Sequence, residues 1–476
     1  MTVPPRRRAD AVRLLARTGL ARAGLAGLAG LAALAPGALA AQTPAAAAVA
    51  RLTPDTLARP AVTLADAIRR AEQVQPSVAQ ARGNVRSAEA RTRSATLGAY
   101  LPDVNFSTSG SNNYSGGDAT TTASGQVIPG GRTVNSFNTG VSASLDLFTG
   151  FRRGADARAA RASETAADAS LVNARFQQAL TTTNTFFDAL SAQQLVSARE
   201  AGVRRAEEQL KVSVAKLQAG SATRSDSLRS TVTLGTAQLQ LIQAQVQLAT
   251  AEANLARLVG APGRVRAADD SAFYRPVVLD TAALRAEALA QSPQVQSATA
   301  SAAAAAAAER AARAAYWPSL TLGGSLGWNG SDAVRSNNPS PNLFDLNPNR
   351  QVSLRLSWSL FNGFQREQTI AQQAATADVA EAQAADARRQ VEAGLVAALA
   401  QLDAAHAQVA ITQTSVAAAR EDLRVVQERY RLGASTIVDV LTSQENLNQA
   451  EVDVVNARYA FLRAKAQLEA LIGRPL

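Results

Sequence analysis

The chain has 476 residues, no Cys, a single His and a formal net charge of +10. Without Cys it has no disulfide framework, thiolate metal site, cysteine nucleophile or lipid-acylated Cys, and one His is too few for a multi-histidine metal cluster. Aromatic residues make up only 4% and Ala is abundant, which favours long, closely packed helices over a thick globular core. We therefore expect no cofactor, no metal site and no catalytic residue.

Residues 1–40 have the composition of a bacterial export signal. Six arginines precede an apolar stretch from Ala23 to Ala35, and Ala38-Leu39-Ala40 places small residues at the cleavage positions. The apolar stretch has about 13 residues, fewer than the roughly 20 that a membrane-spanning helix needs. Residues 1–40 carry six Arg and one Asp, so their removal leaves +5 without a dense basic run. We therefore expect an exported protein with no nucleic-acid partner and no lipid anchor.

The remaining chain contains two copies of one pattern. Four short motifs recur in the same order at an offset of 213 or 216 residues: Ala99-Tyr100-Leu101-Pro102 as Ala315-Tyr316-Trp317-Pro318, Phe148-Thr149-Gly150-Phe151 as Phe361-Asn362-Gly363-Phe364, Gly220 and Asp226 as Gly433 and Asp439, and Leu258-Val259-Gly260 as Leu471-Ile472-Gly473. Such self-similarity predicts two structural repeats. We place a linker at 41–61, the first repeat at 62–262, a second linker at 263–279 and the second repeat at 280–476.

Both repeats predict the same order of elements. In the first we expect a helix from Thr63 to Ala99, a β-hairpin over about 102–148, a long helix over about 150–219 and a return helix over about 226–259. In the second we expect a helix over 280–315, a β-hairpin over about 318–361, a long helix over about 363–432 and a return helix over about 438–472. Pro102 and Pro318 would end the opening helices because proline cannot continue a helix. Each long helix of about 70 residues would span roughly 105 Å.

The hairpin segments alternate apolar with small polar residues at a period of two. Val352, Leu354 and Leu356, for example, alternate with Ser353 and Arg355. Strands of about 10 residues with this pattern are typical of a membrane barrel that meets lipid outside and water inside, although an ordinary half-buried sheet alternates in the same way. Long polar loops at 111–136 and 329–350 lie at one end of the hairpins. At the other end an aromatic girdle favours the membrane interpretation: Tyr100, Phe148, Phe151, Tyr316, Trp317, Phe361 and Phe364.

The helices carry apolar residues at coiled-coil spacing. The long helix of the second repeat has an unbroken seven-residue column: Leu395, Leu402, Val409, Val416, Leu423 and Tyr430. The two return helices have similar columns: Leu228, Val232, Leu239, Ile242 and Val246 in the first, and Val440, Leu447, Val454, Phe461 and Leu468 in the second. A repeat of this kind predicts supercoiled seams between neighbouring helices.

Four strands cannot close a barrel, so the strands themselves predict an assembly. Open sheet edges in lipid leave backbone groups unpaired at several kcal/mol each. Two chains would give eight strands with a filled interior, whereas three would give twelve strands and a lumen. The small polar faces favour a water-filled interior, and we expect a homotrimer. The expected fold class is mainly α with a membrane β-barrel contribution: two structural repeats, long antiparallel coiled-coil helices that form a helical tube, and four β-strands per chain.

Several motifs resemble the TolC-type outer-membrane efflux family, the outer membrane factors. They are the two hairpin ends FTGF and FNGF, the stretch from Tyr430 to Leu441, and Asn456-Ala457-Arg458-Tyr459, and the similarity runs from about residue 61 to 475. The resemblance implies a trimeric channel in the outer membrane of a Gram-negative bacterium, with a twelve-stranded barrel above a periplasmic α-helical barrel. It implies a passive duct and not an enzyme, in contact with outer-membrane lipid. A periplasmic adaptor (membrane fusion) protein would join it to an inner-membrane RND or ABC transporter, for multidrug efflux, metal efflux or type I secretion.

The resemblance also implies roles for residues near the periplasmic mouth. Asp439 matches an inward acidic residue, and three copies around a narrow axis would attract cations. Asp226 and Tyr430 match positions that hold the entrance closed through a hydrogen bond between neighbouring coils. Ser225 keeps the polar partner of a second link, but Ser435 replaces the Arg expected opposite it. A helix N-terminal carboxylate, which is a common placement, would explain Asp439 equally.

The helical hairpin tips are the expected docking site for the adaptor. Gly220 and Gly433 close these tips, and Leu432 and Ser435 lie beside the second. A helix C-cap that needs a positive φ also explains both glycines, and the two roles are compatible.

An exported trimeric coiled-coil stalk or adhesin without transport activity is the alternative. It would explain the export signal and the apolar columns. It would not explain two amphipathic hairpins at equivalent positions of the two repeats. Extraction without detergent would indicate a stalk, whereas a barrel would need detergent.

Overall fold

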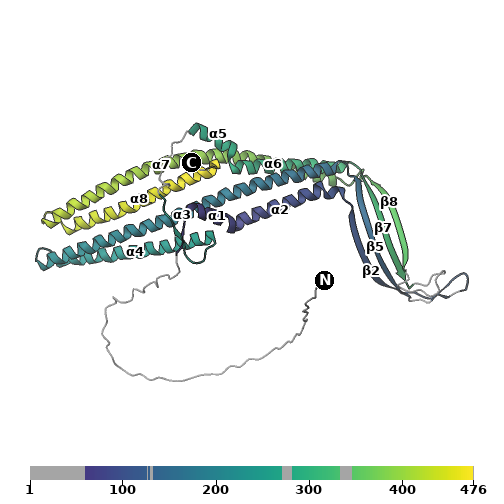
Figure 1. Ribbon diagram of the computed structural model, residues 1–476, viewed down its shortest axis with the longest axis horizontal. Helices are drawn as coiled ribbons and strands as arrows, with labels where there is room; N and C mark the ends of the chain where they lie inside the picture. Colours follow the sequence, from purple (N-terminus) through teal and green to yellow (C-terminus); the bar gives the residue numbers. More distant parts are fainter. Residues whose placement is uncertain (1–58, 126, 129–131, 271–280, 333–345, 475–476) are drawn as a thin grey trace, which may run out of the picture. The chain divides into compact units, whose positions relative to one another are not determined.

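The computed structural model describes residues 59–125, 127–128, 132–270, 281–332 and 346–474. The expected export signal at 1–40 and parts of the two expected linkers lie outside these residues. The described chain consists mostly of long helices, together with one four-stranded sheet (Figure 1).

The two repeats contain matching elements. The first has β1 (Ala61–Val62), α1 (Leu64–Val74), α2 (Pro76–Thr96), η1 (Gly98–Tyr100), β2 (Asp103–Ser115), β3 (Thr120–Thr121), β4 (Val127–Ile128), β5 (Arg132–Phe148), α3 (Arg152–Gln218) and α4 (Arg224–Val259). The second has β6 (Arg266–Ala267), α5 (Thr281–Gln291), α6 (Pro293–Ala312), η3 (Arg313–Tyr316), β7 (Ser319–Ser331), β8 (Asn347–Ser357), α7 (Gln365–Arg431) and α8 (Ile437–Ile472). Helices α3 and α7 both have 67 residues and α4 and α8 both have 36, so the repeats correspond through these helices at a constant offset of 213.

Each opening helix is broken in two, whereas the sequence analysis expected one continuous helix in each repeat. Gln75 has φ −71° and ψ 133°, and Ser292 has φ −55° and ψ 124°. A proline disfavours the α conformation in the residue before it, which is why both breaks precede a proline. Pro76 and Pro293 then begin α2 and α6, because the first helical position needs no N–H donor.

The long strands form one antiparallel sheet in the order β2-β5-β7-β8 (Figure 1). Both expected hairpins are present, and β5 also pairs with β7, so the hairpins of the two repeats join edge to edge. The strands are longer than the expected 10 residues, because the β2–β5 ladder extends to the pair Ser115 and Arg132. The polar loop expected at 111–136 is therefore shorter. Strands β2 and β8 are the sheet edges, and every residue of β8 is exposed.

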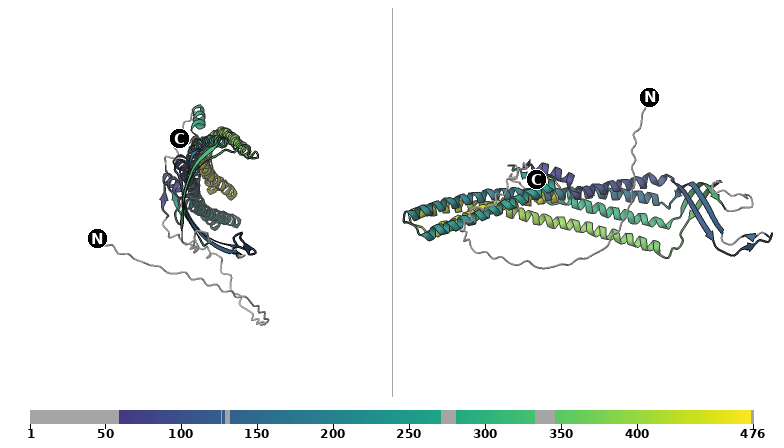
Figure 2. Two further views of the ribbon diagram at one scale, coloured as in Figure 1. Left: turned by 90° about the vertical axis from the view of Figure 1, so that its right-hand side faces the viewer. Right: turned by 90° about the horizontal axis from the view of Figure 1, so that it is seen from below.

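The long helices α3 and α7 support the shorter ones. Helices α2 and α4 both pack against α3, and α6 and α8 both pack against α7 (Figure 2). At the junction of α2 and α4, Gln75 Nε2 donates a hydrogen bond to Leu258 O at 2.8 Å. Helix α3 also packs against α6 and α8, which joins the two repeats. The helices beyond the junction therefore follow the order α4-α3-α8-α7.

The apolar column of α7 is covered by α8, whereas the apolar stripe of α4 is not covered within the chain. Leu395, Leu402, Leu423 and Tyr430 of α7 are buried, and the last two pack with Val440 and Leu447 of α8 as expected. The α4 stripe differs, because all five of its apolar residues are exposed within the described chain: Leu228, Val232, Leu239, Ile242 and Val246. The seam expected for α4 does not form in one chain.

One described helix, α7, contains an 18-residue window that is long and apolar enough to cross a membrane by composition. This is weak support for a membrane span, because core helices pass the same test. Along its length α7 packs against α6 and α8.

We predict that Gly150→Ala destabilises the protein more than Gly125→Ala. Both glycines have positive φ, 63° and 79°, where an L side chain costs about 1 kcal/mol. A Cβ at Gly150 would also lie 2.4 Å from Trp317 Cβ, whereas at Gly125 it would meet nothing within 4 Å. Thermal unfolding of the purified variants by circular dichroism should show the lower midpoint for Gly150→Ala, and equal midpoints would contradict the packing role.

Candidate functional site

The long helices α3 and α7 end in turns of the same design. Gly220 and Gly433 adopt φ values of 75° and 78°. The Gly220 N–H donates to Leu217 O at 3.0 Å, and the next N–H donates to Lys216 O at 2.9 Å. The equivalent bonds after α7 measure 3.2 and 2.8 Å. This Schellman pattern needs a left-handed residue, which explains glycine at both positions.

The return helices begin with matching capping boxes. Thr223 Oγ1 accepts a hydrogen bond from Asp226 N–H at 3.3 Å, and the Asp226 carboxylate accepts from Thr223 N–H at 2.9 Å. Thr436 and Asp439 repeat both bonds at the same distances. Each box satisfies backbone donors that the first helical turn cannot. Asp226 and Asp439 therefore have an observed structural role in starting α4 and α8.

Hydrogen bonds keep both carboxyl groups charged. The Thr436 N–H is the main cause that lowers the pKa of Asp439, followed by the hydroxyls of Thr436 and Ser435. These hydroxyls donate to Asp439 Oδ2 at 2.8 and 2.9 Å. The Thr223 N–H likewise lowers the pKa of Asp226. Each tip thus carries a negative charge at the N-terminus of its return helix, where the helix dipole favours it.

Tyr430 and Lys216 connect the two tips. Lys216 Nζ, from the last turn of α3, lies 3.9 Å from the centroid of the buried Tyr430 ring and donates to the Tyr430 carbonyl oxygen. Burial raises the pKa of the Tyr430 hydroxyl, the Ser213 hydroxyl opposes this shift, and the charge of Asp226 adds to it. Among the described residues, no hydrogen bond joins the Tyr430 hydroxyl to the Asp226 carboxylate, which instead accepts from the Thr223 N–H. The structure therefore brings Asp226 and Tyr430 near each other without a bond between them.

Sequence reasoning missed Lys216. The available signal was a basic residue in the last turn of a long helix, where such residues favour the helix C-terminus. Its contact with Tyr430 could not be read from the sequence, because the two residues belong to different hairpins.

Of the remaining expected tip residues, Ser225 and Leu432 are exposed and Ser435 is half-buried. Ser225 lies in the first turn of α4, and Leu432 is the C-cap of α7. Ser435, which stands where the resemblance implies an Arg, supports the Asp439 carboxylate. The structure thus groups Ser435 with Asp439, and Lys216 with Tyr430.

The expected aromatic girdle lies where the strands meet the long helices. Phe151 makes edge-to-face contacts with Phe148 and Trp317, and Phe361 makes one with Phe364, all with centroids 5.5 Å apart. Two arginines stack on the remaining members: Arg153 over Tyr100 at 5.2 Å and Arg366 over Tyr316 at 4.1 Å. All seven rings are exposed: Tyr100, Phe148, Phe151, Tyr316, Trp317, Phe361 and Phe364. Exposed aromatic residues beside basic ones are typical of a membrane interface.

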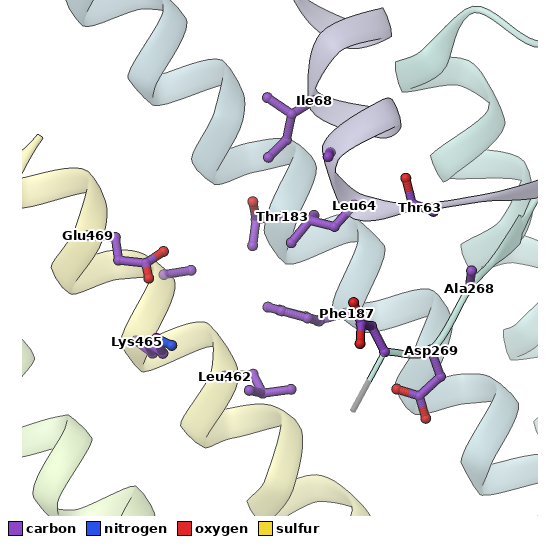
Figure 3. Close-up of a pocket in the computed structure, with 13 residues that line it drawn as sticks. Thr63, Leu64, Ile68, Thr183, Phe187, Ala268, Asp269, Leu462, Lys465 and Glu469 are labelled. Atoms are coloured by element: carbon purple, nitrogen blue, oxygen red, sulfur yellow. The ribbon is translucent and has the colours of Figure 1, made fainter. Parts of the chain in front are cut away.

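A cavity of about 520 Å³ lies between α1, α3, α8 and the segment after β6 (Figure 3). Leu64, Ile68, Phe187 and Leu462 give it an apolar wall. The acidic groups on its rim, Asp269, Asp270 and Glu469, all interact with other residues. Among the described residues no group of three His, Asp or Glu is placed to hold a metal ion.

Comparison with known sequences identifies similar proteins along most of the chain. The family model described as outer membrane efflux protein matches residues 67–261 and 284–474. The outer membrane efflux protein BepC of Brucella suis is 26% identical over 343 residues, which cover 70% of this chain and 72% of BepC. The pyoverdine export outer membrane protein OpmQ of Pseudomonas putida is 26% identical over 415 residues, which cover 83% and 82%.

Solved structures share the fold. CusC superposes with a TM-score of 0.71 at 19% identity, covering 86% of this chain and 92% of CusC. The CmeC outer membrane channel of Campylobacter jejuni gives 0.71 at 18%, covering 86% and 85%. VceC of Vibrio cholerae gives 0.67 at 20%, covering 87% and 96%. These similarities confirm the fold class expected from the sequence.

We predict that Asp439→Asn loosens the start of α8. Because the pKa of Asp439 is lowered in the folded protein, its carboxylate stabilises the start of α8 fully above the ordinary pKa of about 4. This stabilisation is lost as the pH falls through the lower pKa of the folded state. Hydrogen exchange of residues 436–441, corrected for the intrinsic rate, should therefore show weaker protection in the variant at neutral pH. In the unmodified protein protection should fall only in acid. Residues 465–472, distant from this box, are the control, and equal protection of 436–441 in both proteins would contradict the capping role.

We predict that Lys216→Met separates the two tips. The substitution removes a cation–π contact of about 0.5–2 kcal/mol and a donor to the Tyr430 carbonyl. Hydrogen exchange of residues 426–434 should accelerate several-fold. Lys211→Met is the matched control, because Lys211 pairs with Glu208 on its own helix and is well exposed. Similar exchange in both variants would remove Lys216 from this role.

Proposed function

Because this chain belongs to the outer membrane efflux protein family, we propose that it is the trimeric, passive exit duct of a tripartite efflux or type I secretion system. The chain is an outer-membrane efflux channel and not an enzyme, in keeping with the relatives named as an efflux protein and a pyoverdine export protein. We propose in addition that the channel is a trimer, that it binds an adaptor and an inner-membrane transporter, and that the residues discussed below have specific roles.

The open sheet carries the proposal. Strands β2 and β8 each have one side without a partner strand among the described residues. In lipid, every unpaired backbone N–H or C=O costs several kcal/mol, so both edges need strands from other chains. The β5–β7 pairing supports this, because it is an edge-to-edge contact between hairpins of the two repeats. Three chains would supply twelve strands and leave room for a lumen.

The outward face of the sheet supports a lipid environment. Val104, Phe106, Val352, Leu354 and Leu356 are large apolar residues, and all are exposed. A soluble surface rarely gathers so many exposed apolar side chains on one sheet, here on its two edge strands β2 and β8. Lipid in contact with this face would remove the cost of their exposure to water.

The tips would form the periplasmic entrance. Three copies of Asp439 around the axis would make an acidic ring that attracts cations. The turns at Gly220 and Gly433, with the exposed Leu432 and the half-buried Ser435, would be bound by a periplasmic adaptor. An inner-membrane RND or ABC transporter bound to that adaptor would supply the energy for transport through the passive duct.

Planar bilayers test this proposal. Detergent-purified protein should have about three times the mass of its chain without residues 1–40, after subtraction of bound detergent, and should conduct ions. Divalent cations should block the current, and Asp439→Ala should weaken the block by roughly tenfold because it removes the ring of negative charge. Asp378→Ala is the control, an exposed carboxylate of α7 distant from the tips.

Three results would count against it. If divalent cations block the current equally in Asp439→Ala, Asp439 does not form an acidic ring at the entrance. Absence of conductance would overturn the channel. Extraction of the protein without detergent would favour the coiled-coil stalk.

A further inference from the structure

We propose that the first repeat binds the phosphate group of an anionic phospholipid at Arg153, where the sheet meets the long helices. The second repeat has an equivalent arginine, Arg366, but the neighbouring Glu367 neutralises it. The proposal rests on the membrane barrel proposed above. It adds the class of lipid that the barrel binds at its periplasmic edge, and it assigns this lipid to one repeat.

Both repeats hold an arginine in the same place. Arg153 Nη2 donates a hydrogen bond to Asp146 O in β5. At the offset of 213 residues, Arg366 Nη1 donates to Ser359 O at 3.1 Å. Each guanidinium group also lies over a tyrosine ring of the aromatic girdle. The fold therefore places two equivalent cations beside the exposed rings of the girdle.

The two arginines differ in their acidic partner. Arg366 donates to Glu367 Oε1 from Nε at 3.1 Å and from Nη2 at 2.8 Å, and its side chain is only 13% exposed. The equivalent of Glu367 in the first repeat is Gly154. Within the described parts of the chain, the Arg153 side chain donates only to the Asp146 carbonyl and forms no ion pair. Arg153 therefore keeps its charge, and its Nε and Nη1 donors, for a ligand.

The space beside Arg153 is open. A Cβ at Gly154 would meet nothing within 4 Å. In the second repeat the Glu367 side chain grows from the equivalent position and reaches the arginine. The first repeat thus leaves room for an oxyanion from outside, where the second repeat supplies its own carboxylate.

Positive charge is concentrated around Arg153. The segments 91–103 and 152–161, which lead into and out of the first hairpin, contain six Arg and two Asp. The equivalent segments 307–319 and 365–374 contain three Arg and two Glu. Both of these glutamates pair with arginines, whereas among the described residues only one of the two aspartates does. The first repeat is therefore the more basic side of the girdle.

The ligand that fits this surface is a phospholipid with a net negative charge. A guanidinium group binds a phosphate through paired N–H donors, and basic clusters at a membrane surface bind anionic headgroups. The exposed rings of Phe148, Phe151 and Trp317 lie next to this charge and would contact the glycerol region and the acyl chains. A free phosphate would use only the arginine. The committed occupant is therefore an anionic phospholipid, such as phosphatidylglycerol, in the leaflet that faces the periplasm.

Native mass spectrometry of the detergent-purified, assembled protein tests the site. Phosphatidylglycerol and phosphatidylcholine with the same acyl chains are titrated separately, so that only the headgroup differs. We expect about one tighter site per chain for phosphatidylglycerol. Arg153→Gln should weaken phosphatidylglycerol binding by roughly fivefold, the effect of one arginine near an anionic surface, and should leave phosphatidylcholine binding unchanged.

Arg366→Gln is the matched control. Arg366 has the same tyrosine contact and the same carbonyl bond as Arg153, but its charge is already paired with Glu367. This variant should bind phosphatidylglycerol as tightly as the unmodified protein. A general loss of positive charge or of local packing would instead affect both arginine variants equally.

Two substitutions at Gly154 test the site with Arg153 in place. Gly154→Glu supplies the carboxylate that Glu367 provides in the second repeat, so it should weaken phosphatidylglycerol binding as much as Arg153→Gln does. Gly154→Gln adds a side chain of nearly the same size without the charge and should leave binding unchanged. In the opposite direction, Glu367→Gly copies the first repeat and should add a second phosphatidylglycerol site per chain.

The outcomes separate this site from the channel. If the protein conducts ions but binds both lipids equally, or if Gly154→Glu and Gly154→Gln bind phosphatidylglycerol equally, the site is overturned and the channel stands. The two Gly154 variants decide the question even if Arg153→Gln does not assemble. Displacement of phosphatidylglycerol by an equal concentration of inorganic phosphate would also overturn the lipid assignment. Extraction of the protein without detergent would overturn the barrel and the lipid site together.

Discussion

The pairing of β5 with β7 is the contact on which the rest of the structure depends. It joins hairpins of different repeats, although nothing in either hairpin closes the sheet. Because each hairpin leads directly into a long helix, this pairing accompanies the contact of α3 with α6 and α8. It also leaves β2 and β8 as edges that no described strand covers. The inner strands β5 and β7 therefore have strand partners on both sides, whereas β2 and β8 each have a partner on one side only. Free edges of this kind allow pairing with other copies of the chain.

The two repeats have the same backbone plan but different surfaces. Arg205 and Glu451 form an ion pair at the α3–α8 junction, where both side chains are mostly buried. Desolvation makes such a pair costly unless further hydrogen bonds stabilise it, and Arg205 donates one to the Asn448 Oδ1 atom. The equivalent positions on α7 and α4 are small or uncharged. These positions are Ala418, Gly235 and Gln238, so the two repeats share a helical arrangement while their equivalent residues differ in charge and size.

The helical tips combine rigidity with charge. The left-handed glycine ends one helix and the Thr-x-x-Asp box starts the next, so a turn of few residues satisfies its backbone groups locally. The same carboxylate that caps α8 keeps its charge because its hydrogen bonds lower its pKa. Asp439 can therefore cap α8 and at the same time carry the negative charge that the proposed acidic entrance requires. Lys216 adds a link between hairpins that is independent of these caps.

Local chemistry in the sequence determined the order of the elements and the ends of the long helices at Gly220 and Gly433, because strand alternation, helix caps and proline act within a few residues. The aromatic residues between the strands and the long helices could also be located from the sequence, and their role at a membrane interface remains a prediction. The breaks before Pro76 and Pro293 followed from the same local rule but were not anticipated. Tertiary structure alone decided that β5 pairs with β7, that Lys216 meets Tyr430, and that the α7 column is buried while the α4 stripe is exposed. These outcomes depend on which helices and strands become neighbours across about 200 residues, and an apolar column has the same sequence pattern whether its partner lies in the same chain or in another.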